Sequence, residues 1–224
     1  MANKNRTEIA IILDRSGSMQ SICADMEGGF GSFVDKQRHE PGECVLSLYQ
    51  FDDQYDVVYE AKPLADVTAL SLQPRGSTAL LDGVGKSVAN IAARHDALPE
   101  SERPAAVIVL VITDGQENAS VEWKLADVRA AVEAAERTRN WRFVFLGADA
   151  KAFTDARAMG IATAAHYASD TRSVSIMYNA LDVSSRNYRS AVRDGEPAAK
   201  IEIAPDLTGK PKDKRKRRDS DDMN

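Results

Sequence analysis

The stretch Glu8-Ile-Ala-Ile-Ile-Leu-Asp14, followed at once by Arg15-Ser-Gly-Ser18, decides the fold class. Its short apolar run is typical of a buried strand. A second run, Ala105-Ala-Val-Ile-Val-Leu-Val-Ile112, is the most apolar in the chain and follows Pro104. A strand that is apolar on both sides belongs in the middle of a parallel sheet, where helices cover both faces. The two runs therefore predict an α/β domain.

Strand and helix patterns alternate on either side of these runs. Further strand patterns lie at residues 44–51, 141–146 and, more weakly, 162–167. Helical spacing of apolar residues occurs at 22–34, 80–91, 121–135, 151–159 and 174–192, with a polar loop at 95–103. Residues 55–64 form a hairpin pattern with 44–51 across a turn at 52–54. We expect a doubly wound, mostly parallel, Rossmann-like sheet with one antiparallel edge strand and helices on both faces.

A chain of 224 residues suits one large domain with short extensions. We expect an N-terminal extension at residues 1–6, the domain at 7–195 and a tail at 196–224. The end of the tail lacks apolar residues, and the whole tail is expected to be disordered.

Charge is distributed unevenly along the chain. The net charge is −5, yet residues 210–224 carry seven Lys or Arg and four Asp, so the remainder carries −8. An acidic body argues against nucleic acid as the main partner. For the basic tail, two interpretations stay open: a solvated segment, or weak contact with nucleic acid or an acidic partner.

The sequence contains no apolar run of the ~18 residues that a membrane-spanning helix needs. The polar N-terminus does not resemble a secretory signal, so we expect a cytoplasmic protein without membrane contact. Cys23 and Cys44 give neither a disulfide framework nor zinc spacing, and we expect both to be reduced and buried.

Polar residues gather where the predicted strands end. Asp14, Ser16 and Ser18 follow the first strand, Thr78 precedes the helix at 80–91, and Asp114 follows the central strand. Open parallel sheets bind ligands at the carboxyl ends of their strands. All of these side chains offer hard oxygen atoms, which suit Mg²⁺, Mn²⁺ or Ca²⁺ rather than zinc or copper.

Plainer structural roles compete with metal binding at these positions. Asp14, Ser16, Ser18 and Thr78 are all residue types that cap helix N-termini. Glu117 and Asn118 are expected to belong to a solvated loop. Asp82 is expected to support the site or to lie on the surface.

The chain resembles the von Willebrand factor A domain and its metal-ion-dependent adhesion site. The resemblance lies in three motifs: Asp-x-Ser-x-Ser after a first strand, a later Thr, and Thr-Asp-Gly after a central strand. The resemblance covers roughly residues 7–193. It implies that Ser16, Ser18 and Thr78 bind the ion through hydroxyls, and that Asp14 and Asp114 bind it directly or through water. In such domains an acidic residue of a protein partner often completes the coordination.

The sequence therefore favours a metal-dependent protein-binding module that is not an enzyme. The alternative is a metal-dependent hydrolase or phosphatase that uses the same face of the sheet. Phosphatases of the haloacid dehalogenase type need a second carboxylate two residues after the first, and this chain has Ser16 there. No phosphate-binding Gly-x-x-x-x-Gly-Lys loop occurs either.

Overall fold

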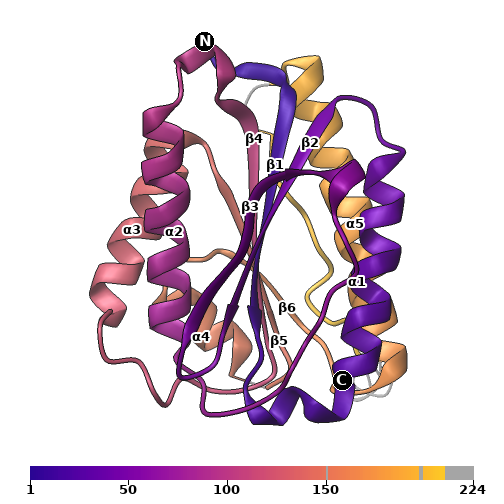
Figure 1. Cartoon of the computed structure of the whole chain (residues 1–224), viewed down its shortest axis with the longest axis vertical. Coiled ribbons are helices and arrows are strands. Elements are labelled where there is room, and N and C mark those ends of the chain that lie inside the picture. The colour runs from indigo at the N-terminus through magenta and orange to yellow at the C-terminus, as the bar shows by residue number, and fades with distance from the viewer. Residues whose placement is uncertain (150, 197–198, 210–224) are drawn as a thin grey trace, which may run out of the picture.

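The computed structural model describes residues 1–149, 151–196 and 199–209 (Figure 1). The strands are β1 (Asn3–Asp14), β2 (Glu43–Phe51), β3 (Tyr55–Pro63), β4 (Pro104–Thr113), β5 (Arg142–Gly147) and β6 (Thr163–His166). The α-helices are α1 (Cys23–Arg38), α2 (Leu80–Ala97), α3 (Leu125–Arg139), α4 (Ala152–Ala158) and α5 (Thr171–Asp194). Short 3₁₀ helices are η1 (Gly17–Ile22), η2 (Leu64–Asp66) and η3 (Glu100–Glu102).

Within the described residues the strands form one sheet in the order β3-β2-β1-β4-β5-β6. All neighbouring strands run parallel except β3, which pairs antiparallel with β2 at the edge. The predicted fold class is confirmed. Because the chain leaves β1 toward β2 on one side and later returns to β4 on the other, the strand order reverses between β1 and β4. Ligands bind at this point in open α/β sheets.

Two apolar layers cover the sheet. Helices α1 and α5 pack on one face, and α2, α3 and α4 pack on the other (Figure 1). Along β1, Ile9, Ile11 and Leu13 point into the first layer, whereas Ala10 and Ile12 point into the second. This alternation is the two-residue period of a strand that is buried on both faces.

The helices end where the sequence provides stop signals. The longest, α5, starts at Asp170, whose carboxylate accepts a hydrogen bond from the Ser173 N–H, and stops at Gly195 in the left-handed conformation. In the described part of the chain, no helix is both long and apolar enough to cross a membrane. The cytoplasmic location stays a prediction.

Several predicted boundaries were wrong. Strand β1 begins at Asn3, inside the predicted extension, because Asn3 pairs with Pro104 and Arg6 with Glu43. Helix α2 continues to Ala97, into the predicted polar loop. Helix α3 begins only at Leu125, and Val121 is 88% exposed instead of marking its apolar face.

The thiols differ from each other in burial. Cys23 and Cys44 are both free, and Cys44 is buried as predicted. Cys23 is only half-buried, which corrects the expectation for it, and its thiol donates to the Leu72 carbonyl oxygen at 3.2 Å.

The predicted disordered tail was wrong for residues 199–209. Ile201 and Leu207 are buried in the layer that contains α1 and α5. The Leu207 N–H donates to the His166 carbonyl oxygen, and the His166 N–H donates to the Pro205 carbonyl oxygen. The segment therefore covers the open edge of β6, which would otherwise leave unpaired backbone groups. The predicted disorder and the basic contact of residues 210–224 lie outside the described residues.

A chain that ends at Gly209 should unfold with the same free energy as the full chain. A chain that ends at Glu196 should lose roughly 2–5 kcal/mol, because Ile201 and Leu207 leave the core and β6 loses its edge partner. Urea unfolding of the two truncated chains measures the difference. Equal free energies of unfolding would show that the 199–209 segment contributes nothing to stability.

Candidate metal centre

The predicted site residues lie at the carboxyl ends of the two central strands. Asp14 is the last residue of β1, and Asp114 directly follows Thr113, the last residue of β4. Thr78 lies two residues before α2 begins. Three loops that are far apart in the sequence therefore meet at the point where the strand order reverses.

The first loop turns its oxygen atoms inward around Asp14. The Asp14 carboxylate is fully buried and accepts a hydrogen bond from the Ser16 N–H at 2.6 Å. The hydroxyl oxygens of Ser16 and Ser18 lie 3.1 Å apart. The Gly17 N–H donates to the Gly76 carbonyl oxygen at 3.3 Å, which joins this loop to the one that carries Thr78.

Helix capping does not explain these residues. Ser16 occupies the N-cap position of η1, but its side chain makes no capping hydrogen bond. Ala79, not Thr78, occupies the N-cap position of α2. The capping interpretation is therefore wrong for both side chains, and neither hydroxyl is taken up by a helix N-terminus.

Asn118 fixes the position of Thr78. The Thr78 N–H donates to the Asn118 side-chain oxygen at 2.8 Å, and the Asn118 N–H donates to the Thr78 carbonyl oxygen at 3.0 Å. Thr78 itself is buried. No hydrogen bond of its hydroxyl occurs among the described residues, so this oxygen is available to a ligand.

The third loop completes the arrangement. The Ser18 hydroxyl donates to Asp114 Oδ1 at 2.5 Å, and the Thr113 hydroxyl donates to Asp14 Oδ2 at 2.6 Å. The structure thus joins Asp14, Ser16, Ser18 and Asp114 in one hydrogen-bonded group.

Gly115 leaves the space between these groups open. A β-carbon at this position would lie 2.9 Å from Thr78 Oγ1, 3.5 Å from Ser18 Oγ and 3.7 Å from Asp14 Oδ2. Oxygen atoms of Thr78, Ser18 and Asp14 therefore surround one small volume beside Gly115 that only a glycine leaves free. Ser18 connects this volume to the other two predicted residues, through its contacts with Asp114 and with the Ser16 hydroxyl.

Burial makes the site electrostatically unfavourable for its own carboxylates. It raises the pKa of Asp14 to about 6, with a further increase from the nearby Asp114 charge, against the hydrogen bonds from Thr113 and Ser16. Burial also raises the pKa of Asp114. Two carboxylates held together in a poorly solvated place gain from a cation between them.

The donor set fits a hard divalent cation. In the described ranges there is no group of three or more His, Cys, Asp or Glu side chains that could hold a metal. A metal centre here has to combine carboxylates with hydroxyls, and that set suits Mg²⁺. Asp14, Ser16, Ser18, Thr78 and Asp114 would hold the ion, which would supply an electrophilic position for an anionic ligand.

Two acidic side chains hold the third loop against α2. Asp82, buried in the first turn of α2, accepts backbone hydrogen bonds from Val121, Glu122 and Trp123. Glu117 accepts one from the Leu81 N–H at 2.9 Å.

Glu117 and Asn118 lie in a loop as predicted, and Asn118 is exposed, but both also make hydrogen bonds that the solvated-loop interpretation did not include. The supporting role predicted for Asp82 is observed. The sequence gives a signal only for Asp82, which lies in the first turn of a predicted helix. A carboxylate is stabilised there by the backbone N–H groups of the helix N-terminus.

Comparisons with known proteins support the fold. No protein-family model matches the sequence, and no curated protein matches it. Among solved structures, a von Willebrand factor type A protein from Catenulispora acidiphila is 17% identical with a TM-score of 0.54, over 83% of this chain and 43% of that one. Proximal thread matrix protein 1 from the mussel byssus is 14% identical with a TM-score of 0.57, over 80% of this chain and 47% of that one.

The pilus adhesin SpaC from Lactobacillus rhamnosus GG is also similar, with 14% identity and a TM-score of 0.56, over 81% of this chain and 30% of that one. The chain spans less than half the length of each of these structures. At such identities the likeness concerns the fold. The strand order, the antiparallel edge strand and this structural similarity agree, and the chain has the von Willebrand factor A-type fold.

Proposed function

We propose that this chain binds a divalent cation, preferentially Mg²⁺, and through that ion binds an acidic side chain of a protein partner. One observation carries the proposal. Carboxylate and hydroxyl oxygens from three loops converge on the space beside Gly115, at the strand ends where this class of sheet binds ligands. Mn²⁺ and Ca²⁺ also bind oxygen donors of this kind, so both are alternative ions for the same site.

The number and charge of the donors leave room for an external ligand. Mg²⁺ takes about six ligands and keeps several waters. Asp14 and Asp114 balance its charge, so an incoming carboxylate is not strongly repelled. Ser18 is exposed and Asp114 is half-buried, so the remaining coordination positions face solvent.

The backbone of Arg75 lies beside the first loop of the site. The Arg75 N–H donates to the Arg15 carbonyl oxygen, next to Ser16, whereas its guanidinium is paired with Asp52 at 2.7 Å. The rest of the domain is acidic, so the ion supplies the local attraction for an acidic partner.

We propose binding rather than hydrolysis because the position two residues after Asp14 carries the Ser16 hydroxyl and not a second carboxylate. The likeness to a pilus adhesin also favours a binding role.

Partner binding should depend on the ion and on Thr78. Replacing Thr78 with alanine should weaken partner binding more than cation binding, since Thr78 comes from a different loop than Asp14 and Ser16. Replacing Asp14 with alanine should abolish both. The measurement is the affinity for a partner, identified by chemical cross-linking, in Mg²⁺, in EDTA, and with each acidic residue of the partner changed in turn. Equal affinity in Mg²⁺ and EDTA would contradict the proposed mechanism.

A further inference from the structure

Asp52 is a buried carboxylate at the same edge of the sheet as the candidate metal centre. It follows Phe51, the last residue of β2, and Phe51 pairs with Asp14 in the neighbouring strand. The Asp52 side chain is fully buried. A buried charge is unfavourable unless other groups compensate it, so the partners of this carboxylate indicate its role.

The Asp52 carboxylate joins two loops of the metal centre. Arg15, in the first loop, donates from Nε to Asp52 Oδ2 at 3.0 Å. Arg75 donates from Nε to the same oxygen at 2.7 Å, and it belongs to residues 73–79, the Thr78 loop. Burial alone would raise the pKa of Asp52, but hydrogen bonds from both arginines and from the Gln54 N–H outweigh it and lower the pKa. The charged oxygen therefore holds a guanidinium from each loop.

Backbone hydrogen bonds attach the Thr78 loop on both sides of Thr78. The Ala79 N–H donates to the Asp52 carbonyl oxygen at 2.8 Å, and the Arg75 N–H donates to the Arg15 carbonyl oxygen at 2.9 Å. The loop itself forms neither helix nor strand. These attachments, together with the contact with the third loop, therefore set where the Thr78 hydroxyl lies.

Gly76 shows how closely the Thr78 loop lies against the end of β2. Its φ is +64°, in the left-handed region, and a β-carbon there would lie 2.5 Å from Asp53 Oδ1. Glycine is the residue that fits such a position. The loop is therefore packed directly against residues 52–53.

The first loop has attachments that do not involve the Asp52 side chain. The Arg15 N–H donates to the last carbonyl oxygen of β2 at 2.8 Å, and the Ser16 N–H donates to Asp14 at 2.6 Å. Loss of the Asp52 charge should therefore displace the Thr78 loop more than the first loop. The Thr78 hydroxyl offers a single ligand atom, and Mg²⁺ demands near-ideal octahedral geometry.

We infer that Asp52 is a positioning residue of the cation centre, which holds Thr78 at the ion by bridging Arg15 and Arg75. The inference rests on the proposed cation binding. Both Asp52 oxygens already accept hydrogen bonds, so Asp52 acts through Thr78 and not on the ion. Hydrogen-bonded supports of this kind typically change metal affinity about 10–100-fold when they are removed.

Titration with Mn²⁺ of the Asp52→Asn chain, with and without Thr78→Ala, tests the inference. Asparagine has one acceptor oxygen in place of two and no charge, so Asp52→Asn alone should weaken Mn²⁺ binding roughly tenfold, and no more than Thr78→Ala does. With Thr78→Ala already present, Asp52→Asn should cost about twofold at most, because the ligand that it positions is gone. A residue that only stabilises the fold would give equal losses in both backgrounds.

Arg75→Gln separates positioning from simple charge. The Arg75 side chain is 53% exposed, so this variant should fold even if Asp52→Asn does not. Removal of a nearby positive charge would by itself tighten the binding of a cation. Removal of the bridge should instead weaken Mn²⁺ binding several-fold, and again only while Thr78 is present. Tighter binding by this variant overturns the inference.

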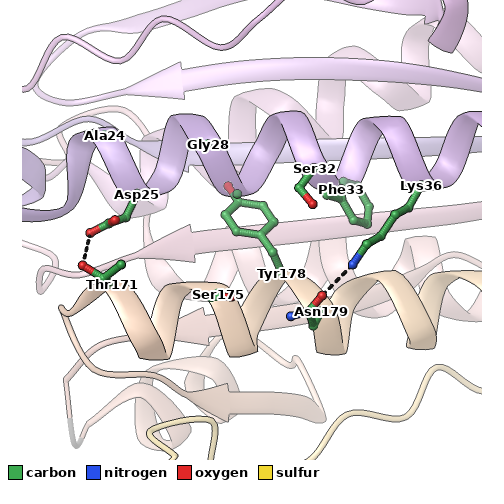
Figure 2. A pocket seen from close by; sticks show the side chains of 11 residues that line it. Ala24, Asp25, Gly28, Ser32, Phe33, Lys36, Thr171, Ser175, Tyr178 and Asn179 are labelled. Carbon is green, nitrogen blue, oxygen red and sulfur yellow. Dashed lines mark hydrogen bonds between the residues drawn. The ribbon is translucent and has the colours of Figure 1, made fainter.

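Two hydrogen bonds between α1 and α5 supply matched controls (Figure 2). Asp25 accepts from the Thr171 hydroxyl at 3.0 Å, and Lys36 donates to Asn179 at 2.6 Å. Asp25→Asn and Lys36→Gln remove the same charges as the two test variants, each with one hydrogen bond between separate elements. Neither should change the affinity for Mn²⁺.

Equal losses in the two Thr78 backgrounds, or losses in the controls as large as in the test variants, overturn the inference and leave the cation site in place. A chain without a saturable Mn²⁺ site overturns the proposed function as well. The two failures differ in whether the unchanged chain binds Mn²⁺.

Discussion

Replacing Asp14 with asparagine should abolish the stabilisation of the chain by Mg²⁺ and should make the cation-free chain more stable. The first effect follows because Asp14 is the buried carboxylate of the site, and asparagine lacks its charge. A cation that binds only the folded chain adds about 2.7 kcal/mol at a hundred times its dissociation constant. The variant should lose this increment completely.

The second effect follows from the raised pKa of Asp14. Burial raises this pKa to about 6 in the folded chain, above the value of 3.8 for an unperturbed aspartate. The folded state thus binds the proton more tightly than the unfolded state. Without cations, the ionised carboxylate at neutral pH costs on the order of 2–3 kcal/mol, and this cost disappears as the pH falls from above 6 toward 4.

Asparagine removes that cost at every pH. The cation-free variant should therefore be more stable at neutral pH and should lack the gain in stability that the unchanged chain shows as the pH falls from 7 to 5. Thermal unfolding with EDTA and with Mg²⁺ at both pH values measures these effects. Asp127→Asn, at an exposed position on α3, serves as the control. A variant that still responds to Mg²⁺ would show that Asp14 does not hold the ion.

Replacing Glu8 with alanine should destabilise the chain by roughly 3–5 kcal/mol, because removal of one partner from a buried ion pair leaves the other charge uncompensated. Glu8 is fully buried in the middle of β1, six residues before Asp14. Arg94 and Ser47 both donate to its Oε1, and His95 Nε2 lies 2.7 Å from its Oε2.

The pH dependence of this contribution has the opposite sign to that of Asp14. Burial alone would raise the pKa of Glu8, but hydrogen bonds from His95 and Arg94 outweigh it and lower the pKa to about 2. The stabilisation is therefore complete above pH 4.5 and is lost as the pH falls from there toward 2.

Urea unfolding of Glu8→Ala, with Glu133→Ala as control, measures the effect. Glu133 forms an exposed pair with Arg129, and loss of that pair should cost less than about 1 kcal/mol. Equal losses in the two variants would contradict the role assigned to Glu8. The stabilisation by Mg²⁺ should persist in both.

The site could be predicted from sequence because strand ends in parallel sheets have a fixed relation to one another. Once residues 8–14 and 105–112 were recognised as buried parallel strands, Asp14 and Asp114 had to lie at the same edge. The element order and the antiparallel edge strand followed from apolar periodicity in the same way.

The supports of the site could be predicted only in part. A supporting role was one of two roles expected for Asp82, but its partners and the contact of Asn118 could not be foreseen. Both side chains act through hydrogen bonds to backbone groups about forty residues away, and such contacts leave no periodic pattern. The return of residues 199–209 to β6 was missed for a related reason. Ile201 and Leu207 are isolated apolar residues in a polar stretch, and their burial depends on an open sheet edge.

The most direct test of the cation site is a titration of the chain with Mn²⁺, followed by electron paramagnetic resonance, in which Mg²⁺ then competes. One saturable site per chain is expected. Gly115→Ala should weaken it roughly tenfold or more, because the new methyl group would lie 2.9 Å from Thr78 Oγ1 in the space meant for the ion. Gly17→Ala, whose methyl group would lie at an ordinary 3.6 Å from the Gly76 carbonyl oxygen, should leave binding unchanged. Absence of a saturable site, or equal binding by the Gly115→Ala and unchanged chains, would contradict the proposal that this fold holds a divalent cation between its three loops.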